Sequence, residues 1–296
     1  MRMFRGSFVA IVTPFSKDGR KIDYGLFREL LQWHLQSGTD GIVPAGCTGE
    51  AATLSHEEQV RLIEFTVKTV SGRAKVVAGT GSNCTAEALH LTQAARKVGA
   101  DAAMLITPYY NKPTPEGQYR HYRLLAEKGG LPLMLYNVPS RTGINMLPET
   151  VARLHREVEN VMAIKEAGGS VDQVSAIKRL CDIAVMSGDD SLTLPMMAVG
   201  ASGVVSVLAN LLPAEVKAMV DAAARGDFNR ARQLHYQMLP LMKAMFLETN
   251  PICIKTALRL VGRGNGVLRM PLCEMQPKTL ASLKDALREY GLKIKG

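Results

Sequence analysis

One lysine of this chain stands where a lysine can do covalent chemistry. Lys165 ends the apolar run Met162-Ala163-Ile164, and Gly168-Gly169 follow it closely enough for the chain to turn away sharply. Burial at the end of a strand lowers the pKa of a lysine from about 10.4 towards neutrality. The uncharged amine can then form a Schiff base with a carbonyl compound. The competing interpretation is a solvated strand end at which Lys165 pairs with Glu166.

Other groups suited to the same chemistry follow other apolar runs. Tyr136 ends one run, Arg141 lies in the turn after it, and Thr48 lies in the turn Gly46–Glu50. A phenol can carry protons, and a guanidinium can hold a carboxylate with two hydrogen bonds. Taken singly, Tyr136 could be a core aromatic and Arg141 a solvated turn residue. Together with Lys165 they indicate an amine-catalysed reaction at a carbonyl group.

The chain alternates short apolar runs with amphipathic helical stretches, so these residues sit on a repeating framework. Continuous apolar runs are typical of parallel strands buried on both faces. Eight such units predict an α/β protein with a (β/α)8 TIM barrel, whose site lies at the carboxyl ends of the strands. An open doubly wound sheet is the alternative, but no nucleotide-binding glycine motif follows the first run. Strands are expected at Ser7–Val12, Gly41–Pro44, Lys75–Gly79, Ala102–Ile106, Leu133–Tyr136, Val161–Lys165, Ile183–Ser187 and Gly203–Val207.

Local signals mark several helices and a region beyond the barrel. Leu26, Leu30 and Trp33 predict the apolar stripe of an early helix. Ser55 with Glu58, and Ser170 with Gln173, have the spacing of capping boxes. We expect the barrel to occupy residues 1–225 and a C-terminal helical region to occupy 226–296. Its helical stretches are expected near Asp227–Leu247, Pro251–Leu260 and Thr279–Tyr290.

Composition excludes several function classes. The net charge of +9 is spread along the chain, and the aromatic content of 5% offers no stacking platform for bases, so nucleic-acid binding is not expected. The five cysteines form no CxxC pattern, which argues against a zinc site and a disulfide framework. No apolar run reaches the ~18 residues of a membrane span. We expect a cytoplasmic protein that needs no metal and no cofactor.

Longer stretches around these residues resemble a known family. They run in order through Gly46–Glu50, Pro108–Pro113, Tyr136–Gly143, Ile164–Ala167, Ser187–Asp190 and Asn250-Pro251. In this order they resemble the pyruvate-dependent class I aldolase superfamily that includes N-acetylneuraminate lyase. Within it, the stretch Tyr136–Thr142 is most similar to the dihydrodipicolinate synthase family. The resemblance covers about residues 6–271.

The resemblance implies a reaction and roles for the catalytic residues. Lys165 would form a Schiff base with pyruvate, and Tyr136 would move protons. The backbone amides of residues 46–48 and the Thr48 hydroxyl would hold the pyruvate carboxylate. The resulting enamine would attack aspartate-4-semialdehyde, giving 4-hydroxy-tetrahydrodipicolinate for lysine and diaminopimelate biosynthesis. A different pyruvate aldolase, with a sugar acid or an aromatic aldehyde as partner, remains the alternative.

The resemblance also implies surroundings for this centre. Arg141 would hold the carboxylate of the second substrate, and the Val205 carbonyl and the Gly188-Asp189 loop would lie near the substrates. Tyr110 would reach the site of a neighbouring subunit across a tight dimer interface. The assembly would be a homotetramer, a dimer of tight dimers.

Two features depart from the family pattern. Cys47 stands where the family has a threonine, whose hydroxyl links Tyr136 to Tyr110 in a proton relay. A thiol is a weaker hydrogen-bonding group, so slower turnover or a catalytically weak sensor paralogue is the further alternative. Lysine-inhibited members bind lysine at an interface site, and two of the matching positions here, Ala51 and Gln59, differ from theirs, so weak or absent inhibition is expected. The matching positions are Ala51, His56, Gln59, Asn83, Glu87 and Tyr109.

Overall fold

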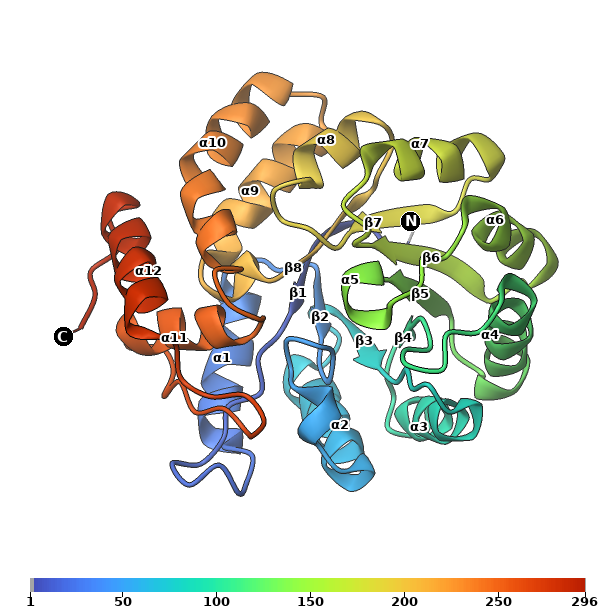
Figure 1. The fold of residues 1–296 in the computed structure, drawn as a ribbon, viewed down its shortest axis with the longest axis horizontal. Helices are drawn as coiled ribbons and strands as arrows, with labels where there is room; N and C mark the ends of the chain where they lie inside the picture. The colour runs from blue at the N-terminus through green and yellow to red at the C-terminus, as the bar shows by residue number, and fades with distance from the viewer. Residues whose placement is uncertain (1–2, 296) are drawn as a thin grey trace.

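The computed structural model describes residues 3–295 and is built around a closed barrel of parallel strands (Figure 1). Each strand pairs with the next in the sequence, and β1 closes the ring by pairing with β8. The predicted (β/α)8 barrel is therefore confirmed, and the open sheet is wrong. The strands are β1 (Gly6–Ala10), β2 (Gly41–Val43), β3 (Lys75–Gly79), β4 (Ala102–Ile106), β5 (Leu133–Asn137), β6 (Val161–Glu166), β7 (Ala184–Ser187) and β8 (Gly203–Ser206).

Helices surround the barrel and cover its outer face. Two short 3-10 helices, η1 (Ala51–Thr53) and η2 (Leu208–Asn210), follow β2 and β8. The α-helices are α1 (Tyr24–Gln36), α2 (His56–Val70), α3 (Thr85–Lys97), α4 (Pro115–Gly129), α5 (Pro139–Thr142), α6 (Pro148–Glu157), α7 (Val171–Leu180), α8 (Thr193–Ala198), α9 (Pro213–Ala224), α10 (Phe228–Ala244), α11 (Ile252–Leu260) and α12 (Pro277–Glu289).

Alternation along the strands decides which side chains face the barrel interior. Met134, Tyr136 and Ala163 belong to one buried cluster, which fills the barrel. Leu135 and Ile164, one position away, belong to the larger cluster that joins the strands to the helices. Side chains of a strand point alternately to its two faces, so Lys165, two positions after Ala163, extends inward. The apolar run therefore delivers the amine to the inside of the barrel.

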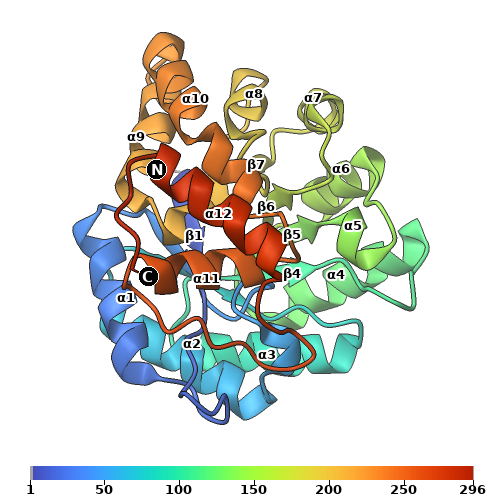
Figure 2. The ribbon, with the colours of Figure 1, turned by 60° about the vertical axis from the view of Figure 1, so that its left-hand side comes forward.

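The last three helices pack beside the barrel rather than within its ring. Helix α10 packs on α9, and α12 packs on α10 and α11. Figures 1 and 2 show α11 and α12 next to α1 and α10. The division of the chain at residue 225 stays a prediction. None of the helices described in residues 3–295 is long and apolar enough to cross a membrane.

Two local expectations need correction. The first is the apolar stripe of α1: its buried face carries Phe27, Leu31 and His34 in addition to Leu30, so the predicted stripe was displaced by one position. The second is a capping box, described below; the other predicted capping box, of Ser55 and Glu58, is present.

The second capping box is only half formed. Ser170 accepts from the backbone N–H of Gln173, as expected. The side-chain amide of Gln173 donates instead to Glu166 (2.9 Å) and to Asn145 (3.2 Å). A buried carboxylate attracts a donor more strongly than a helix end does, which explains the difference.

Candidate active site

Lys165 lies at the carboxyl end of β6 with only 5% of its surface exposed. Its Nζ lies 4.2 Å from the centroid of the Tyr136 ring. Burial lowers its pKa to about 8, Cys47 and Asp190 act in the opposite direction, and Arg141 lowers it further. The solvated strand end is therefore wrong, because burial favours the uncharged, nucleophilic amine.

Glu166 does not pair with Lys165 but points to the outer face of the barrel. Its carboxylate accepts from Asn137 Nδ2 (3.1 Å to both oxygens), from the Gly168 N–H (2.6 Å) and from Gln173. Strand pairing sets Tyr136 opposite Lys165 and Asn137 opposite Glu166. The bond between Asn137 and Glu166 on the outer face therefore helps to keep Tyr136 and Lys165 opposite each other on the inner face.

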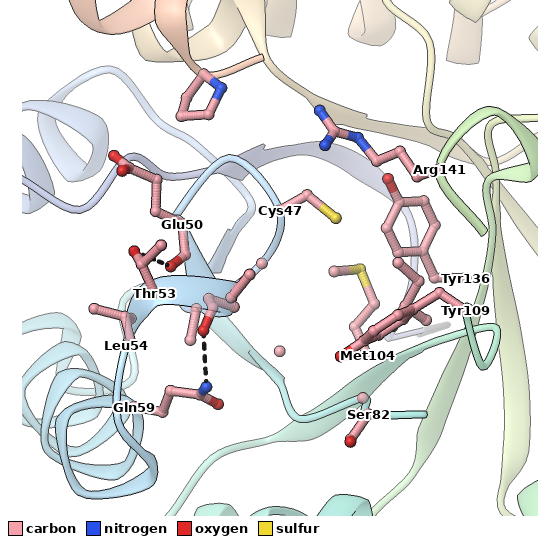
Figure 3. Close-up of a pocket in the computed structure, with 18 of the residues that line it drawn as sticks. Cys47, Glu50, Thr53, Leu54, Gln59, Ser82, Met104, Tyr109, Tyr136 and Arg141 are labelled. Carbon is pink, nitrogen blue, oxygen red and sulfur yellow. Dashed lines mark hydrogen bonds between the residues drawn. The ribbon is translucent and has the colours of Figure 1, made fainter. Parts of the chain in front are cut away.

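Tyr136 contacts both Cys47 and Arg141, and all three face one cavity (Figure 3). Burial raises the pKa of Tyr136 well above 10, the neighbouring Cys47 thiol acts in the same direction, and the positive charge of Arg141 lowers it. The phenol therefore keeps its proton at neutral pH and can donate it to a developing negative charge. The thiol occupies the place that the relay prediction gave to a hydroxyl.

Thr48 lies in the turn between β2 and η1, which is tightly held. The Thr13 hydroxyl donates to the Gly49 carbonyl (2.7 Å), and the amide of Asn250 donates to the Thr48 hydroxyl (2.9 Å). A side chain at Gly79 would come within 2.2 Å of the Ala45 carbonyl, so the absence of one lets β3 lie close to this turn. Thr48 is buried, with its hydroxyl fixed from one side.

Two adjoining cavities open at this end of the barrel. One, of about 800 Å³, is lined by Lys165 and Thr48. The other, of about 460 Å³, is lined by Cys47. Tyr136, Arg141 and Asn250 line both, so the two cavities share one wall. A carbonyl compound bound at Lys165 would therefore lie between the hydroxyl of Thr48 and the guanidinium of Arg141.

The remaining substrate residues lie as follows. Gly188 and Asp189 line the larger cavity. A side chain at Gly188 would come within 2.9 Å of Lys165 Cε, so glycine leaves room for the amine. Val205 is buried in the cluster inside the barrel. Tyr110 is 89% exposed and has positive φ (68°), so its position is set by its loop and not by contacts with the cavities.

The positions expected to hold lysine lie around the smaller cavity. Ala51, His56, Gln59 and Tyr109 line it. Ser82, another lining residue, donates to the Glu87 carboxylate (2.7 Å). The Asn83 carbonyl accepts from Asn111 Nδ2 (2.8 Å). The Gln59 amide is occupied by a bond to the Ala51 carbonyl (3.1 Å), which Figure 3 shows.

Two residues of the site were not assigned a role from the sequence. Asp190 is buried and accepts from the Ser206 hydroxyl (2.5 Å) and from the N–H groups of Val207 (3.0 Å) and Leu208 (2.9 Å). Asn250 contacts Thr48 through its side chain and Arg141 through its backbone. Neither contact has a local sequence signal, because each joins segments distant in the chain.

Among the described residues, 3–295, no group of three or more His, Cys, Asp and Glu could hold a metal ion.

Comparisons with known proteins show the family of this chain. The profile of the dihydrodipicolinate synthetase family matches residues 3–290. The chain is 53% identical over 292 residues to the 4-hydroxy-tetrahydrodipicolinate synthase of Thermodesulfovibrio yellowstonii, covering 98% of this chain and 99% of that protein. Its structure is similar to dihydrodipicolinate synthase from Aquifex aeolicus (TM-score 0.96, 46% identity, 99% and 100% covered). It is also similar to the Acinetobacter baumannii enzyme solved with pyruvate (TM-score 0.94, 42% identity, 97% and 99% covered). This chain belongs to the dihydrodipicolinate synthetase family.

Proposed function

We propose that this chain condenses pyruvate with aspartate-4-semialdehyde to give 4-hydroxy-tetrahydrodipicolinate. The observation that carries the proposal is the buried amine of Lys165, whose pKa is lowered to about 8 and which lies against the Tyr136 ring. The names of the relatives support this choice of substrates. We also propose that the reaction supplies lysine and diaminopimelate biosynthesis.

The reaction can be written with every proton accounted for. The Lys165 amine adds to the keto carbon of pyruvate and water leaves, which gives an imine. A proton lost from the methyl carbon gives an enamine. The enamine carbon bonds to the aldehyde carbon of the second substrate, and the aldehyde oxygen takes up one proton to become the hydroxyl. The amine of the condensed product then adds to the imine carbon and closes the ring, and its two protons pass to the nitrogen of Lys165, which leaves as the free amine. The neutral phenol of Tyr136 can donate a proton when water leaves.

The two carboxylates would be held by different groups. We propose that the Thr48 hydroxyl and the turn amides of residues 46–48 bind the carboxylate of pyruvate, as oriented amides do. Arg141 would bind the carboxylate of the aldehyde. The Gly188-Asp189 loop and the Val205 carbonyl would bound the reacting carbons.

Assembly and control remain proposals beyond the catalytic centre. We propose a homotetramer in which Tyr110 reaches a neighbouring subunit, since 89% of its surface is exposed in the single chain. Sedimentation that gives a monomer at assay concentration would contradict the assembly. We further propose weak or absent inhibition by lysine, because the Gln59 amide is held by the Ala51 carbonyl. An inhibition constant in the micromolar range would contradict that.

A coupled assay tests the function directly. The parent enzyme, assayed with pyruvate and aspartate-4-semialdehyde, is expected to turn over without added metal or cofactor. Sugar-acid and aromatic aldehydes, tested at equal concentration, are expected to react far more slowly. Faster turnover with either class would reassign the second substrate. No turnover with any aldehyde would favour a sensor paralogue.

A further inference from the structure

Asn250 comes from the C-terminal helical region, yet it stands in the wall of both cavities. It lies between α10 and α11 and is 6% exposed. It lines the cavity of Lys165 and also the cavity of Cys47. Its neighbour Thr48 belongs to the turn after β2 and its neighbour Arg141 to α5, so the three residues come together from distant parts of the chain.

The side chain of Asn250 determines which way the Thr48 hydroxyl is used. Asn250 Nδ2 donates to Thr48 Oγ1 over 2.9 Å in a buried environment. A hydroxyl has one hydrogen to donate and two lone pairs to accept with. Because one lone pair takes the Asn250 bond, the hydroxyl hydrogen remains for an acceptor such as a carboxylate in the cavity.

The backbone of Asn250 holds the second anchor. The Arg141 guanidinium donates through one terminal nitrogen to the Asn250 carbonyl over 2.8 Å. A guanidinium has five N–H donors in a fixed plane. Fixing one of them orients the plane and leaves the others for a carboxylate. The same residue therefore touches both groups that would bind carboxylates.

We propose that Asn250 is a positioning residue that orients Thr48 and Arg141, so that the C-terminal helical region takes part in substrate recognition. This inference rests on the proposed function. The roles of Thr48 and Arg141 can be separated by experiment. A substitution of the Asn250 side chain removes its bond to Thr48 and leaves the bond from Arg141 to its backbone carbonyl. Only the pyruvate anchor should then be affected.

The test is a double-mutant cycle between Asn250→Leu and Thr48→Val. Leucine is similar in size to asparagine but cannot donate to the Thr48 hydroxyl. Asn250→Leu is therefore expected to raise the KM for pyruvate about tenfold, because the hydroxyl is no longer oriented for its charge-assisted hydrogen bond to the pyruvate carboxylate. The KM for the aldehyde and kcat are expected to change by less than about twofold. In the Thr48→Val background, where the hydroxyl is already absent, Asn250→Leu is expected to have no further effect. Asn250→Ala serves as a second variant if the leucine disturbs folding.

A matched control separates positioning from general stability. Asn265 also joins the C-terminal region to the barrel, with Nδ2 donating to the Phe15 carbonyl (2.5 Å), but it does not line either cavity of the site. Asn265→Leu is expected to lower the melting temperature and leave the KM for pyruvate unchanged.

The outcomes distinguish this inference from the function on which it rests. If borohydride traps pyruvate on the parent but the KM for pyruvate is unchanged in Asn250→Leu and Asn250→Ala, the positioning role is wrong. The positioning role is also wrong if the effects of Asn250→Leu and Thr48→Val on the KM for pyruvate simply add. It is wrong as well if Asn250→Leu lowers kcat and raises both KM values by similar factors. A parent that traps no pyruvate contradicts the proposed function itself, and this inference with it.

Discussion

At the scale of single residues, burial accounts for the reactivity that we propose for Lys165. A pKa of about 8 leaves about a tenth of the amine uncharged at pH 7, against roughly one part in three thousand at the ordinary value of 10.5. Lys255 shows that a low pKa alone is not enough, since burial also lowers its pKa to about 8. The amine of Lys255 is occupied by Glu50 and the Thr13 carbonyl, whereas Lys165 lines a cavity.

The shift predicts how trapping depends on pH. The ammonium form of Lys165 cannot attack a carbonyl. The rate at which pyruvate is trapped on Lys165 by reduction should therefore rise with pH and level off above about pH 8. Cyanoborohydride trapping followed by intact mass measures this rate. A rate still rising steeply at pH 10 would show that the amine keeps its ordinary pKa.

Cys47 stands where the resemblance to the family leads us to expect a threonine. Its thiol lies beside the Tyr136 phenol (Figure 3) and raises the pKa of that phenol, and a thiol passes protons less well than a hydroxyl. Cys47→Thr is therefore expected to raise kcat for condensation several-fold. Cys84→Thr, at an exposed thiol, is the control and should leave kcat unchanged. A Cys47→Thr rate equal to or below that of the parent would refute the relay argument.

Residue types predicted much of this centre and missed the rest for a physical reason. Lys165, Tyr136 and Arg141 stand at or after apolar runs, which the sequence displays. Asp190 and Asn250 act through contacts with residues remote in the chain, and a sequence shows no contact of that kind. Neither their motifs nor their spacing could have revealed the bonds.

At the scale of elements, the β5–β6 pair holds the two residues to which we assign the proposed chemistry. Its inner face carries Tyr136 and Lys165, and its outer face carries Asn137 and Glu166 in the next register position. The Glu166 carboxylate accepts from N–H donors of Asn137, Gln173 and Gly168. A carboxylate that only accepts fits this arrangement. Strands β5 and β6 each end one residue later than predicted, at Asn137 and Glu166, because hydrophobicity does not register such a polar pair.

Replacing this carboxylate should loosen the pair. Glu166→Gln would place an NH2 group against N–H donors, and is expected to cost about 1–3 kcal/mol of unfolding free energy. Misplacement of the neighbouring Lys165 should lower kcat as well. Denaturant unfolding measures the first effect, and Glu159→Gln, an exposed carboxylate just before β6, is the control. Equal stability of the two variants would contradict the account.

At the scale of the whole molecule, an ionic cluster, buried at Lys255 and Glu50 and partly exposed at Arg269 and Glu58, joins the C-terminal region to the barrel. Lys255 of α11 bonds to the Glu50 carboxylate (2.5 Å), which also accepts from the backbone N–H of Arg269 (3.0 Å). The Arg269 guanidinium reaches Glu58 of α2 (2.6 and 2.7 Å). Glu50 lies two residues after Thr48. The cluster that attaches the C-terminal region to the barrel therefore also holds the turn that carries Thr48. The sequence predicted the extra helices but gave no sign of this attachment.

Breaking this cluster on one side should be costly. Lys255→Met leaves the Glu50 carboxylate buried without its cation, and is expected to lower the unfolding free energy by about 3–5 kcal/mol. Adding Glu50→Gln should restore part of the loss. Lys68→Met, which breaks an ion pair whose lysine side chain is 72% exposed, should cost no more than about 1 kcal/mol. Similar losses in Lys255→Met and Lys68→Met would show that the cluster is not essential to the attachment.

Borohydride reduction in the presence of pyruvate, read by intact mass and peptide mapping, shows directly which amine forms the imine. Lys165 and Lys255 share a lowered pKa, so the identity of the modified lysine separates a cavity amine from a merely buried one. The account predicts one reduced pyruvyl group per chain, on Lys165, and none in Lys165→Met. An adduct on Lys255, or no adduct on the parent, would contradict it.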